Sequence, residues 1–407
     1  MKTINTAQVR SMNHHSVRRQ LLLLHSATKA QLAAATGLSP MTVGTIITQM
    51  QRDGEVFELD AVPSSGGRPS VRYAYEKDFA LMMIVYGYQK ADRNLVCVRI
   101  RNLFGEVVAA CEQFMENVTL ERLECLMDQT LEKGTVPAGR EASAGTEVLA
   151  GLKVPEGTAV PMGPEVPAGP VTAAGTSMDR DKPIRRGLWE KVRVIGFGLP
   201  GVERDGRIVS NDYSELVGTD FIAHFRQRYG AEIRFINDIN AAVYGYYDRM
   251  KPFSACEDME LSPAVVGIYY PRLYYPGVGI IIDGKIYLGS QNFAGEVCRL
   301  PYGGPGTLYP ADWLAIDYGN REQVCACIAG HLSQICSVLA PERIVLYGDF
   351  FSPEDVGRVS VLTEQLLEGR FHVQLDIVAD LSGDFERGLS VLMEDLLYRT
   401  VFDGEGL

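Results

Sequence analysis

Near the N-terminus, the residues best suited to bind a ligand are small and polar, and one helix would expose them together. They are Ser39, Thr42, Gly44, Thr45 and Gln49. A Gln side chain can form two hydrogen bonds to adenine, and Thr offers base edges a hydroxyl and a methyl group. No Lys or Arg occurs in this segment before Arg52. Contacts to phosphate groups are therefore expected from Arg18, Arg19, Lys29 and Arg68.

A helix that exposes such residues must pack against other helices, and the preceding sequence predicts two of them. Residues 10–25 and 29–35 place apolar residues at helical spacing. Thr28 is a suitable N-cap, and Gly37 marks a tight turn. Ser39 then caps a third helix that begins at Pro40. Two helices joined by a short turn that contains Gly are typical of a helix-turn-helix.

A strand pair is expected after these helices. Residues 55–59 and 71–75 have strand character, and the Gly-rich segment 64–69 lies between them. An Arg on a narrow tip such as Gly66-Gly67-Arg68-Pro69 suits insertion into an A·T-rich minor groove. The alternative is a hairpin tip that only contacts solvent. Residues 1–76 are therefore predicted to form a winged helix-turn-helix domain.

The distribution of charge supports a division of the chain. Its 407 residues exceed one ordinary domain, and the net charge is −12. Residues 1–75 contain eight Lys or Arg and four Asp or Glu, which leaves them at +4 and the rest of the chain at −16. This asymmetry indicates a basic module attached to an acidic body. Affinity for nucleic acid is not expected of the whole surface.

The composition also indicates the cellular location of the protein and the state of its cysteines. No apolar run approaches the length of a membrane span, and residues 1–13 lack the apolar core of a signal peptide, so a cytoplasmic protein is expected. The eight cysteines are scattered, which favours reduced thiols over a disulfide framework. Cys325 and Cys327 lie in an apolar run, and we interpret them as core residues.

From Leu81 onward, predicted strands, among them residues 192–199 and 343–347, alternate with predicted helices, which indicates an α/β body with mixed sheets. Residues 134–187 interrupt this pattern, with Gly recurring every six residues from Gly139 to Gly175. Hexapeptide repeats can build a parallel β-helix. The six prolines from Pro137 to Pro170 could not donate to a ladder, so we predict a mobile insertion rich in Gly, Pro and Ala.

Four motifs in the body, in this order and spacing, resemble the ROK family of repressors and sugar kinases. They are Gly198-Leu199-Pro200-Gly201-Val202, Ile236-Asn237-Asp238-Ile239-Asn240-Ala241-Ala242, Gly277-Val278-Gly279-Ile280-Ile281-Ile282-Asp283-Gly284 and Phe293-Ala294-Gly295-Glu296-Val297. The resemblance covers residues 80–400 and extends to the winged module of the repressor branch. It implies an actin-like ATPase (ribonuclease H-like) fold, a two-lobed α/β body with a first lobe at about residues 80–215 and a second at about 216–400.

The resemblance also implies a ligand cleft. In the kinases of the family, an Asp after Asn deprotonates a sugar hydroxyl, and Asp238 stands at that position. An Asx-type turn between a strand and a helix is the alternative interpretation. The residues expected to contact an effector are Asn211, Asn237, Asp238, Glu296 and Arg299.

At the positions that correspond to the family's nucleotide-binding turns, this sequence has different residues. Its first phosphate turn corresponds to residues 85–89, where Val85 replaces the Asp and Tyr88 a Gly. Its second corresponds to residues 273–275, with Tyr274 and Tyr275, and its adenosine turn to residues 347–350. Bulky side chains there would occupy the phosphate position. We therefore expect no phosphoryl transfer, no catalytic residue and no cofactor.

The residues that form the family's zinc site are also replaced in this sequence. Arg299 stands where the family has a His, and residues 300–318 contain no Cys, so no metal is expected. Arg299 would suit a carboxylate or a phosphate, which suggests a phosphorylated or acidic sugar as effector. The alternative is that Arg299 pairs with Glu296 or another acid.

Taken together, these features predict a DNA-binding transcriptional regulator, a repressor of carbohydrate-related genes. It would act as a homodimer or tetramer on a near-palindromic, A·T-rich operator. Two alternatives remain. One is a sugar kinase that transfers phosphate from ATP to a hexose with Asp238 as base. The other is a repressor whose body serves only for dimerisation.

Overall fold

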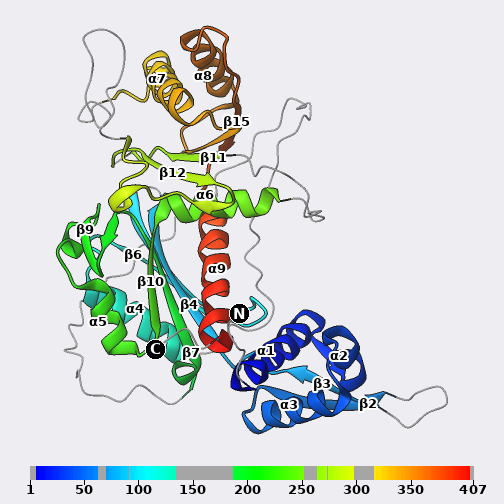
Figure 1. The fold of residues 1–407 in the computed structure, drawn as a ribbon. Helices are drawn as coiled ribbons and strands as arrows, with labels where there is room; N and C mark the ends of the chain where they lie inside the picture. Colours follow the sequence, from blue (N-terminus) through cyan, green and yellow to red (C-terminus); the bar gives the residue numbers. More distant parts are fainter. Residues whose placement is uncertain are drawn as a thin grey trace, which may run out of the picture.

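The computed structural model describes residues 6–62, 70–90, 92–133, 187–251, 264–272, 274–297 and 316–403. In these ranges, a small N-terminal unit is followed by two larger layers, each built on a five-stranded sheet (Figure 1). None of the helices found there is long and apolar enough to cross a membrane.

The N-terminal unit, residues 6–75, combines three helices with a small antiparallel sheet of strand order β1-β3-β2. The elements are α1 (Thr6–Leu24), β1 (Ser26–Thr28), α2 (Lys29–Thr36), α3 (Pro40–Arg52), β2 (Val56–Val62) and β3 (Ser70–Tyr75). Local sequence fixes where the helices begin. Thr28 and Gln31 form a capping box at α2, and the Ser39 side chain accepts a hydrogen bond from the Thr42 amide at α3.

The first sheet of the body has the order β10-β7-β4-β5-β6. Its strands are β4 (Leu81–Lys90), β5 (Arg93–Asn102), β6 (Val107–Met115), β7 (Val192–Leu199) and β10 (Glu232–Asn237). Residues of β4 alternate between two cores, as a strand buried on both faces requires. Leu81 and Val85 pack with α4 (Leu120–Lys133) and α5 (Phe221–Tyr229), whereas Met82 and Ile84 pack on the opposite side with α9 (Ser382–Tyr398).

The second sheet has the order β13-β12-β11-β14-β15. Its strands are β11 (Val265–Tyr269), β12 (Gly277–Ile282), β13 (Lys285–Ile286), β14 (Arg343–Tyr347) and β15 (Gln374–Val378). Both sheets share one topology, in which an antiparallel meander of three strands is extended by two strands parallel to its first. Helices α7 (Arg321–Leu339) and α8 (Pro353–Leu366) pack on each other and share an apolar core with this sheet.

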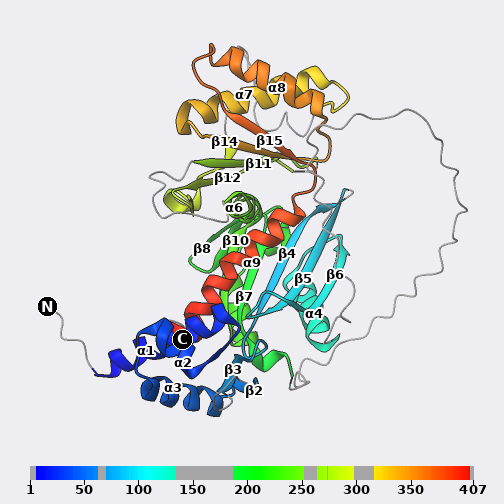
Figure 2. The ribbon, with the colours of Figure 1, turned by 90° about the vertical axis from the view of Figure 1, so that its right-hand side faces the viewer.

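Helices α6 (Asp238–Met250) and α9 cross between the two sheets (Figure 2). Glycines allow their close approach. A side-chain carbon on Gly245 would lie 1.9 Å from the Asp384 carbonyl oxygen, and one on Gly388 would lie 1.9 Å from that of Ala241. The backbones of the helices are therefore in direct contact at this crossing.

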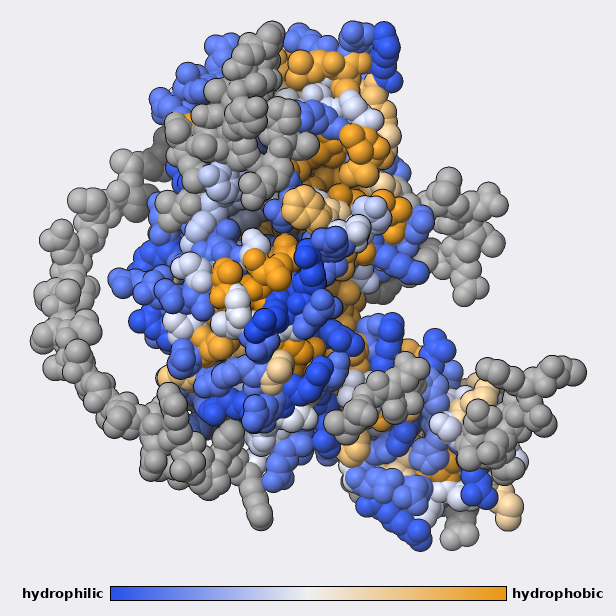
Figure 3. Space-filling view, turned by 60° about the vertical axis from the view of Figure 1, so that its left-hand side comes forward, coloured by the Kyte–Doolittle hydropathy of each residue, from blue (hydrophilic) through white to orange (hydrophobic). Residues whose placement is uncertain are grey.

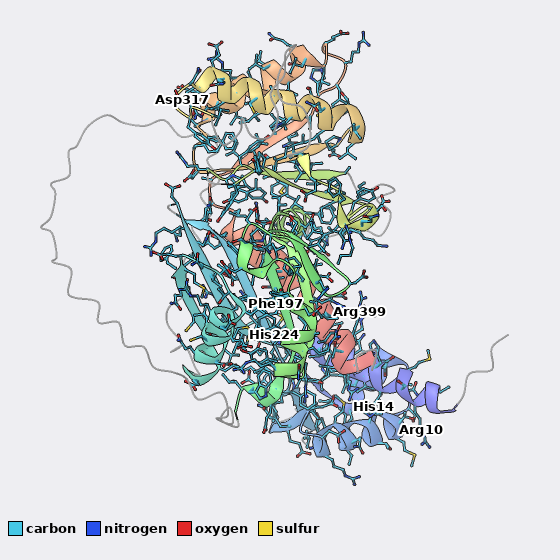
Figure 4. The ribbon with its side chains drawn as sticks, turned by 90° about the vertical axis from the view of Figure 1, so that its left-hand side faces the viewer. Arg10, His14, Phe197, His224, Asp317 and Arg399 are labelled. Carbon is cyan, nitrogen blue, oxygen red and sulfur yellow. The ribbon has the colours of Figure 1, made fainter. Side chains whose placement is uncertain are left out.

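The C-terminal end of α9 reaches the N-terminal unit. It continues into the π-helical turn η6 (Arg399–Asp403), which contacts α1, and Figure 4 shows Arg399 beside the helix that carries Arg10 and His14. Phe402 lies with its ring centroid 6.1 Å from that of Tyr75 and 5.5 Å from the Arg18 guanidinium carbon. The N-terminal unit is thus packed against the last turn of a helix that begins at the junction of the two sheets.

The remaining elements are short. A two-stranded hairpin is formed by β8 (Val202–Arg204) and β9 (Arg207–Ser210). Within the described ranges, 3₁₀ turns are formed by η1 (Trp189–Lys191), η2 (Ser214–Leu216) and η3 (Ser290–Asn292).

The mixed α/β body predicted from the sequence is confirmed, as are most of its predicted strands and helices. Predictions for residues 192–199 and 343–347 coincide with β7 and β14, and Cys325 and Cys327 are buried in α7 as expected. The sequence did not predict the strands β1, β4, β8, β9, β13 and β15 or the helices α8 and α9. The predicted insertion at residues 134–187 lies outside the described residues except for Gly187.

Candidate functional site

The small and polar residues predicted on α3 share its outer side. Ser39, Thr45 and Gln49 are exposed and Thr42 and Gly44 are half-buried. The opposite side of α3 is buried, through Val43, Ile46, Ile47 and Met50. A side-chain carbon added to Gly44 would meet open space.

Two of these side chains have only surface partners. The Thr45 hydroxyl donates to the Met41 carbonyl oxygen at 3.1 Å, and the Gln49 amide donates to the Asp53 carboxylate at 2.9 Å. Both hydrogen bonds are solvent-exposed, so an incoming polar group can replace them at little cost. This side of α3 therefore offers exchangeable donors and acceptors.

The predicted phosphate contacts have different outcomes. Arg18 faces the interior, since its Nε donates to the Glu55 carboxylate at 2.8 Å and its side chain is only 18 % exposed. Its position does not support a phosphate contact, because the guanidinium already neutralises a buried acid. Lys29 is half-buried, with its Nζ 5.0 Å from the centre of the Tyr73 ring. Arg68 lies outside the described residues.

A pocket of about 150 Å³ lies where the two sheets of the body meet. One wall comes from the first sheet and its hairpin, with Gly201, Glu203 and Asn237. The other wall comes from β12 and the segment after it, with Val278 and Glu296. Two of the predicted effector residues, Asn237 and Glu296, therefore line one pocket although they are far apart in the sequence.

Asn237 caps α6 and lines this pocket, whereas Asp238, the first residue of α6, is not among the residues that line it. The Asn237 side chain accepts from the Asn240 amide at 3.3 Å and donates to the Gly201 carbonyl oxygen at 3.1 Å. The alternative interpretation of this motif as a helix-capping turn is thus correct for Asn237, which also lines the pocket. Asp238 is 9 % exposed, and its carboxylate accepts from the Ile239 amide at 2.8 Å.

A carboxylate that the sequence did not single out, Asp212, adds to this region. Burial and the neighbouring charge of Glu296 raise its pKa to about 6. Burial, with the charges of Asp212 and Glu296, raises the pKa of Asp238 to about 7. Asp212 is nevertheless accessible to solvent. A solvent-accessible side chain that is surrounded by enough protein to raise its pKa is typical of a cleft. In the sequence, only its position directly after Asn211 could have pointed to Asp212.

Asn211 lies behind the pocket wall. Its Oδ1 accepts from the Tyr213 amide at 2.7 Å, whereas its Nδ2 is buried and has no hydrogen-bond partner. A side-chain carbon on Gly201 would lie 2.9 Å from that Nδ2 and 2.2 Å from the Ser210 carbonyl oxygen. Only glycine fits there, with its φ of 116°. Arg299 lies outside the described residues.

Aromatic side chains crowd two of the positions that correspond to nucleotide turns. Residues 85–89 lie inside β4, and the Tyr213 hydroxyl is 2.9 Å from where a side-chain carbon of Gly87 would be. Ring carbons of Phe351 and Phe350 lie 2.9 and 3.1 Å from the same position at Gly348. The first position is therefore a strand rather than a turn, and both glycines are covered by rings.

Within the described ranges, no group of three or more His, Cys, Asp or Glu side chains is arranged to hold a metal ion.

Figure 3 shows one face of the molecule, on which apolar side chains gather over the middle of the body while hydrophilic ones predominate below them.

Comparisons with known proteins point to one family, although no family model matches the sequence. The crystal structure of a ROK family transcriptional regulator, described as a homolog of the E. coli MLC protein, superposes with a TM-score of 0.51. That superposition covers 97 % of this chain and 98 % of the other at 14 % sequence identity, so it shows a shared fold.

The curated relatives found by sequence include a repressor and several kinases. The xylose repressor of Bacillus subtilis is 21 % identical over 303 residues, which are 73 % of this chain and 62 % of the repressor. An N-acetyl-D-glucosamine kinase of Vibrio vulnificus is 25 % identical over 166 residues, or 39 % of this chain and 48 % of the kinase. The chain thus spans about half the length of the kinases it matches. The comparisons confirm the resemblance to the ROK family, and to its transcriptional regulators, that the four motifs indicated.

Proposed function

We propose that this protein is a DNA-binding transcriptional regulator, a repressor of carbohydrate-related genes that acts in the cytoplasm. Residues 1–76 would form a winged helix-turn-helix domain, and residues 80–400 a kinase-like body that binds a sugar-type effector. The protein would act as a homodimer or tetramer on a near-palindromic, A·T-rich operator.

One observation carries this proposal. The outer side of α3 carries polar residues and does not pack against the core of the N-terminal unit. A recognition helix needs one side packed and the other available to the major groove. The exposed Ser39, Thr45 and Gln49 opposite the buried Val43 and Ile47 meet this requirement. Of the four cations predicted to contact phosphate, Arg19 and Lys29 support it best, while Arg18 stabilises the domain.

The body supports regulation better than catalysis. Phosphoryl transfer needs backbone amides of Gly-rich turns close to the phosphates. At the corresponding positions, Tyr213 covers Gly87, and Phe350 and Phe351 cover Gly348. The pocket on the sugar side is retained, with Asn237 and Glu296 in its walls. A body that keeps the ligand pocket but fills the nucleotide turns suits an effector-binding role.

A sugar kinase remains the second candidate because of one feature. Burial and neighbouring acids raise the pKa of Asp238 to about 7, which is the range of a general base at neutral pH. Incubating the protein with ATP and a panel of hexoses tests this candidate. Hexose-dependent ADP release that Asp238→Asn abolishes would favour the kinase.

A contact route between the pocket and the N-terminal unit supports the regulatory role. Helix α6 begins at the pocket and crosses α9, whose last turn carries Phe402 against Tyr75 and Arg18. A ligand that shifts the two lobes relative to each other would therefore move the N-terminal units apart or together. Such coupling requires different ligand affinities in the two arrangements.

The deciding experiment is selection of fragmented genomic DNA on the purified full-length protein. We expect an enriched, A·T-rich inverted repeat near genes of carbohydrate metabolism. Replacing Gln49 by Ala should change or abolish the enriched sequence, whereas Gln365→Ala, at an exposed position of α8, should not. Absence of any enriched site at about 100 mM salt, where specific complexes persist, would refute the proposal.

A further inference from the structure

The N-terminal unit is joined to the body first by the chain itself, which passes from β3 to β4 through residues 76–80. The Glu76 amide donates to the Glu55 carbonyl oxygen, within the unit, at 2.7 Å. The Lys77 carbonyl oxygen accepts from the Leu103 amide, within the body, at 3.0 Å. Two successive residues are therefore bound to different units. A single joint of this kind leaves the unit able to turn, because each residue keeps two soft backbone dihedrals.

The last turn of α9 adds a further attachment. Phe402 is 8 % exposed, and its ring meets two side chains of the N-terminal unit. The Tyr75 ring stands edge-on to it, at an interplanar angle of 85°, and the Arg18 guanidinium lies over its face. Both arrangements are attractive, since the face of an aromatic ring is negative and its edge positive.

One buried acid holds both partners of Phe402 in place. The Arg18 Nε donates to the Glu55 carboxylate at 2.8 Å, and the Tyr75 hydroxyl donates to the same carboxylate at 3.1 Å. Arg18 thus uses the edge of its planar guanidinium on Glu55 and leaves its face to the ring. Because these side chains are already ordered, little conformational freedom is lost when Phe402 packs against them.

The body holds Phe402 from the other side. The Tyr398 ring centroid lies 5.8 Å from that of Phe402, and the Tyr398 hydroxyl donates to the Leu103 carbonyl oxygen at 3.2 Å. Another ring contact joins His25 to Phe104, with centroids 4.6 Å apart. His25 is exposed, so this contact orders the unit less than the buried Phe402 does.

We propose that Phe402 is a positioning residue, whose contact with Arg18 and Tyr75 fixes the orientation of the N-terminal unit on the body. In a dimer, this orientation sets the distance and rotation between the two α3 helices. Each α3 would read one half-site, so one half-site spacing would be bound most tightly. This consequence for DNA rests on the proposed function, whereas the fixed orientation does not.

The first test measures the orientation without DNA. A fluorescent unnatural amino acid at position 41 of α3, where Met41 is 84 % exposed, reports how the unit tumbles in the full-length protein. Time-resolved anisotropy of the unmodified protein should show the unit moving with the whole molecule. Phe402→Ala and Phe402→Leu should both add a faster segmental component, larger for Ala. Hydrogen exchange of the α3 amides should stay slow in both variants, which separates release of the unit from its unfolding.

Phe114→Ala is the matched control. The Arg93 guanidinium carbon lies 4.4 Å from the centre of the Phe114 ring, so this variant also removes a contact between Arg and Phe, but one between β5 and β6. It should add no segmental component. Unchanged tumbling of both Phe402 variants, or release of the unit in Phe114→Ala, would overturn the inference. Rapid exchange of α3 in both Phe402 variants would also overturn it, because Phe402 would then stabilise the fold of the unit instead of its position.

The second test uses the operator enriched by the unmodified protein and a copy with one base pair added between its half-sites. We expect the unmodified protein to bind the altered copy about tenfold more weakly, and Phe402→Leu to reduce this difference to about threefold or less, because a released unit can adjust. An unchanged difference in Phe402→Leu would overturn the inference. Failure to enrich any operator would refute the proposed function, and the anisotropy decay would still decide whether Phe402 holds the unit.

Discussion

Replacing Gly388 by Ala should loosen the junction between the two lobes. The added carbon would lie 1.9 Å from the Ala241 carbonyl oxygen and 2.7 Å from the Gly245 amide nitrogen, whereas real side-chain carbons stay beyond 3.0 Å. Both obstacles are backbone atoms of α6, which no rotamer change can remove. The two helices would therefore have to separate by about 1 Å at their crossing, and the contacts around it would weaken.

The size of this effect follows from two opposing contributions. Overpacking of a well-packed core costs about 1–3 kcal/mol, and a rigid obstacle favours the upper end. Ala is about 1 kcal/mol better than Gly inside a helix. The expected net loss in the free energy of unfolding is therefore about 2 kcal/mol.

Chemical denaturation followed by far-UV circular dichroism measures this loss, with two glycines as controls. Gly357 in α8 and Gly383 in α9 have nothing within 4 Å of an added carbon, so Ala should leave stability unchanged or raise it by up to about 1 kcal/mol. If Gly388→Ala were as stable as the unmodified protein, or changed in the same direction as Gly357→Ala, the close helix crossing would be refuted.

Three further predictions concern the N-terminal unit and the pocket. Glu55→Gln leaves Arg18 without its buried counter-charge, so the N-terminal unit should lose about 2–4 kcal/mol of stability, seen as faster proteolysis of residues 6–75 than of the body; an unchanged cleavage rate would contradict this. Replacing both Thr45 and Gln49 by Ala should weaken operator binding about tenfold or more in gel-shift titrations without lowering the unfolding temperature; equal affinity would exclude α3 as the reading helix. The pKa of Asp238 is raised to about 7 in the folded protein, so its contribution to stability is present at low pH and is lost as pH rises through 7. The unfolding temperature of Asp238→Asn should therefore exceed that of the unmodified protein increasingly between pH 5 and pH 8, and a constant difference would show that Asp238 is not the titrating group.

Features set by short-range sequence were predictable. The caps at Thr28 and Ser39, the turn at Gly37 and the buried strand at residues 192–199 depend on neighbouring residues, and all are present. The pairing of Asn237 with Glu296 across one pocket followed only from the resemblance to the ROK family, because these residues are brought together by the two sheets.

What could not be predicted depends on tertiary contacts. Arg18 had the character of a phosphate-binding residue, yet it neutralises Glu55, which β2 brings into the core 37 residues later. Asp212 is ordinary in sequence, and its raised pKa arises from Glu296 and the surrounding protein. Helix α9 begins with Ser382-Gly383-Asp384, a poor local signal, and it is stabilised by packing against α6 and the first sheet.

The positions that correspond to the family's nucleotide turns differ from the pocket in what a ligand would require of them. A nucleotide is held by backbone amides. Atoms of Tyr213 and Phe351 lie 2.9 Å from where side-chain carbons of Gly87 and Gly348 would be. A sugar is held by side chains of several elements, which can be exchanged one at a time while the pocket keeps its shape. In the proposed regulator, a ligand that closes the lobes would act through the packing of α6 on α9 on Tyr75 and the N-terminal unit.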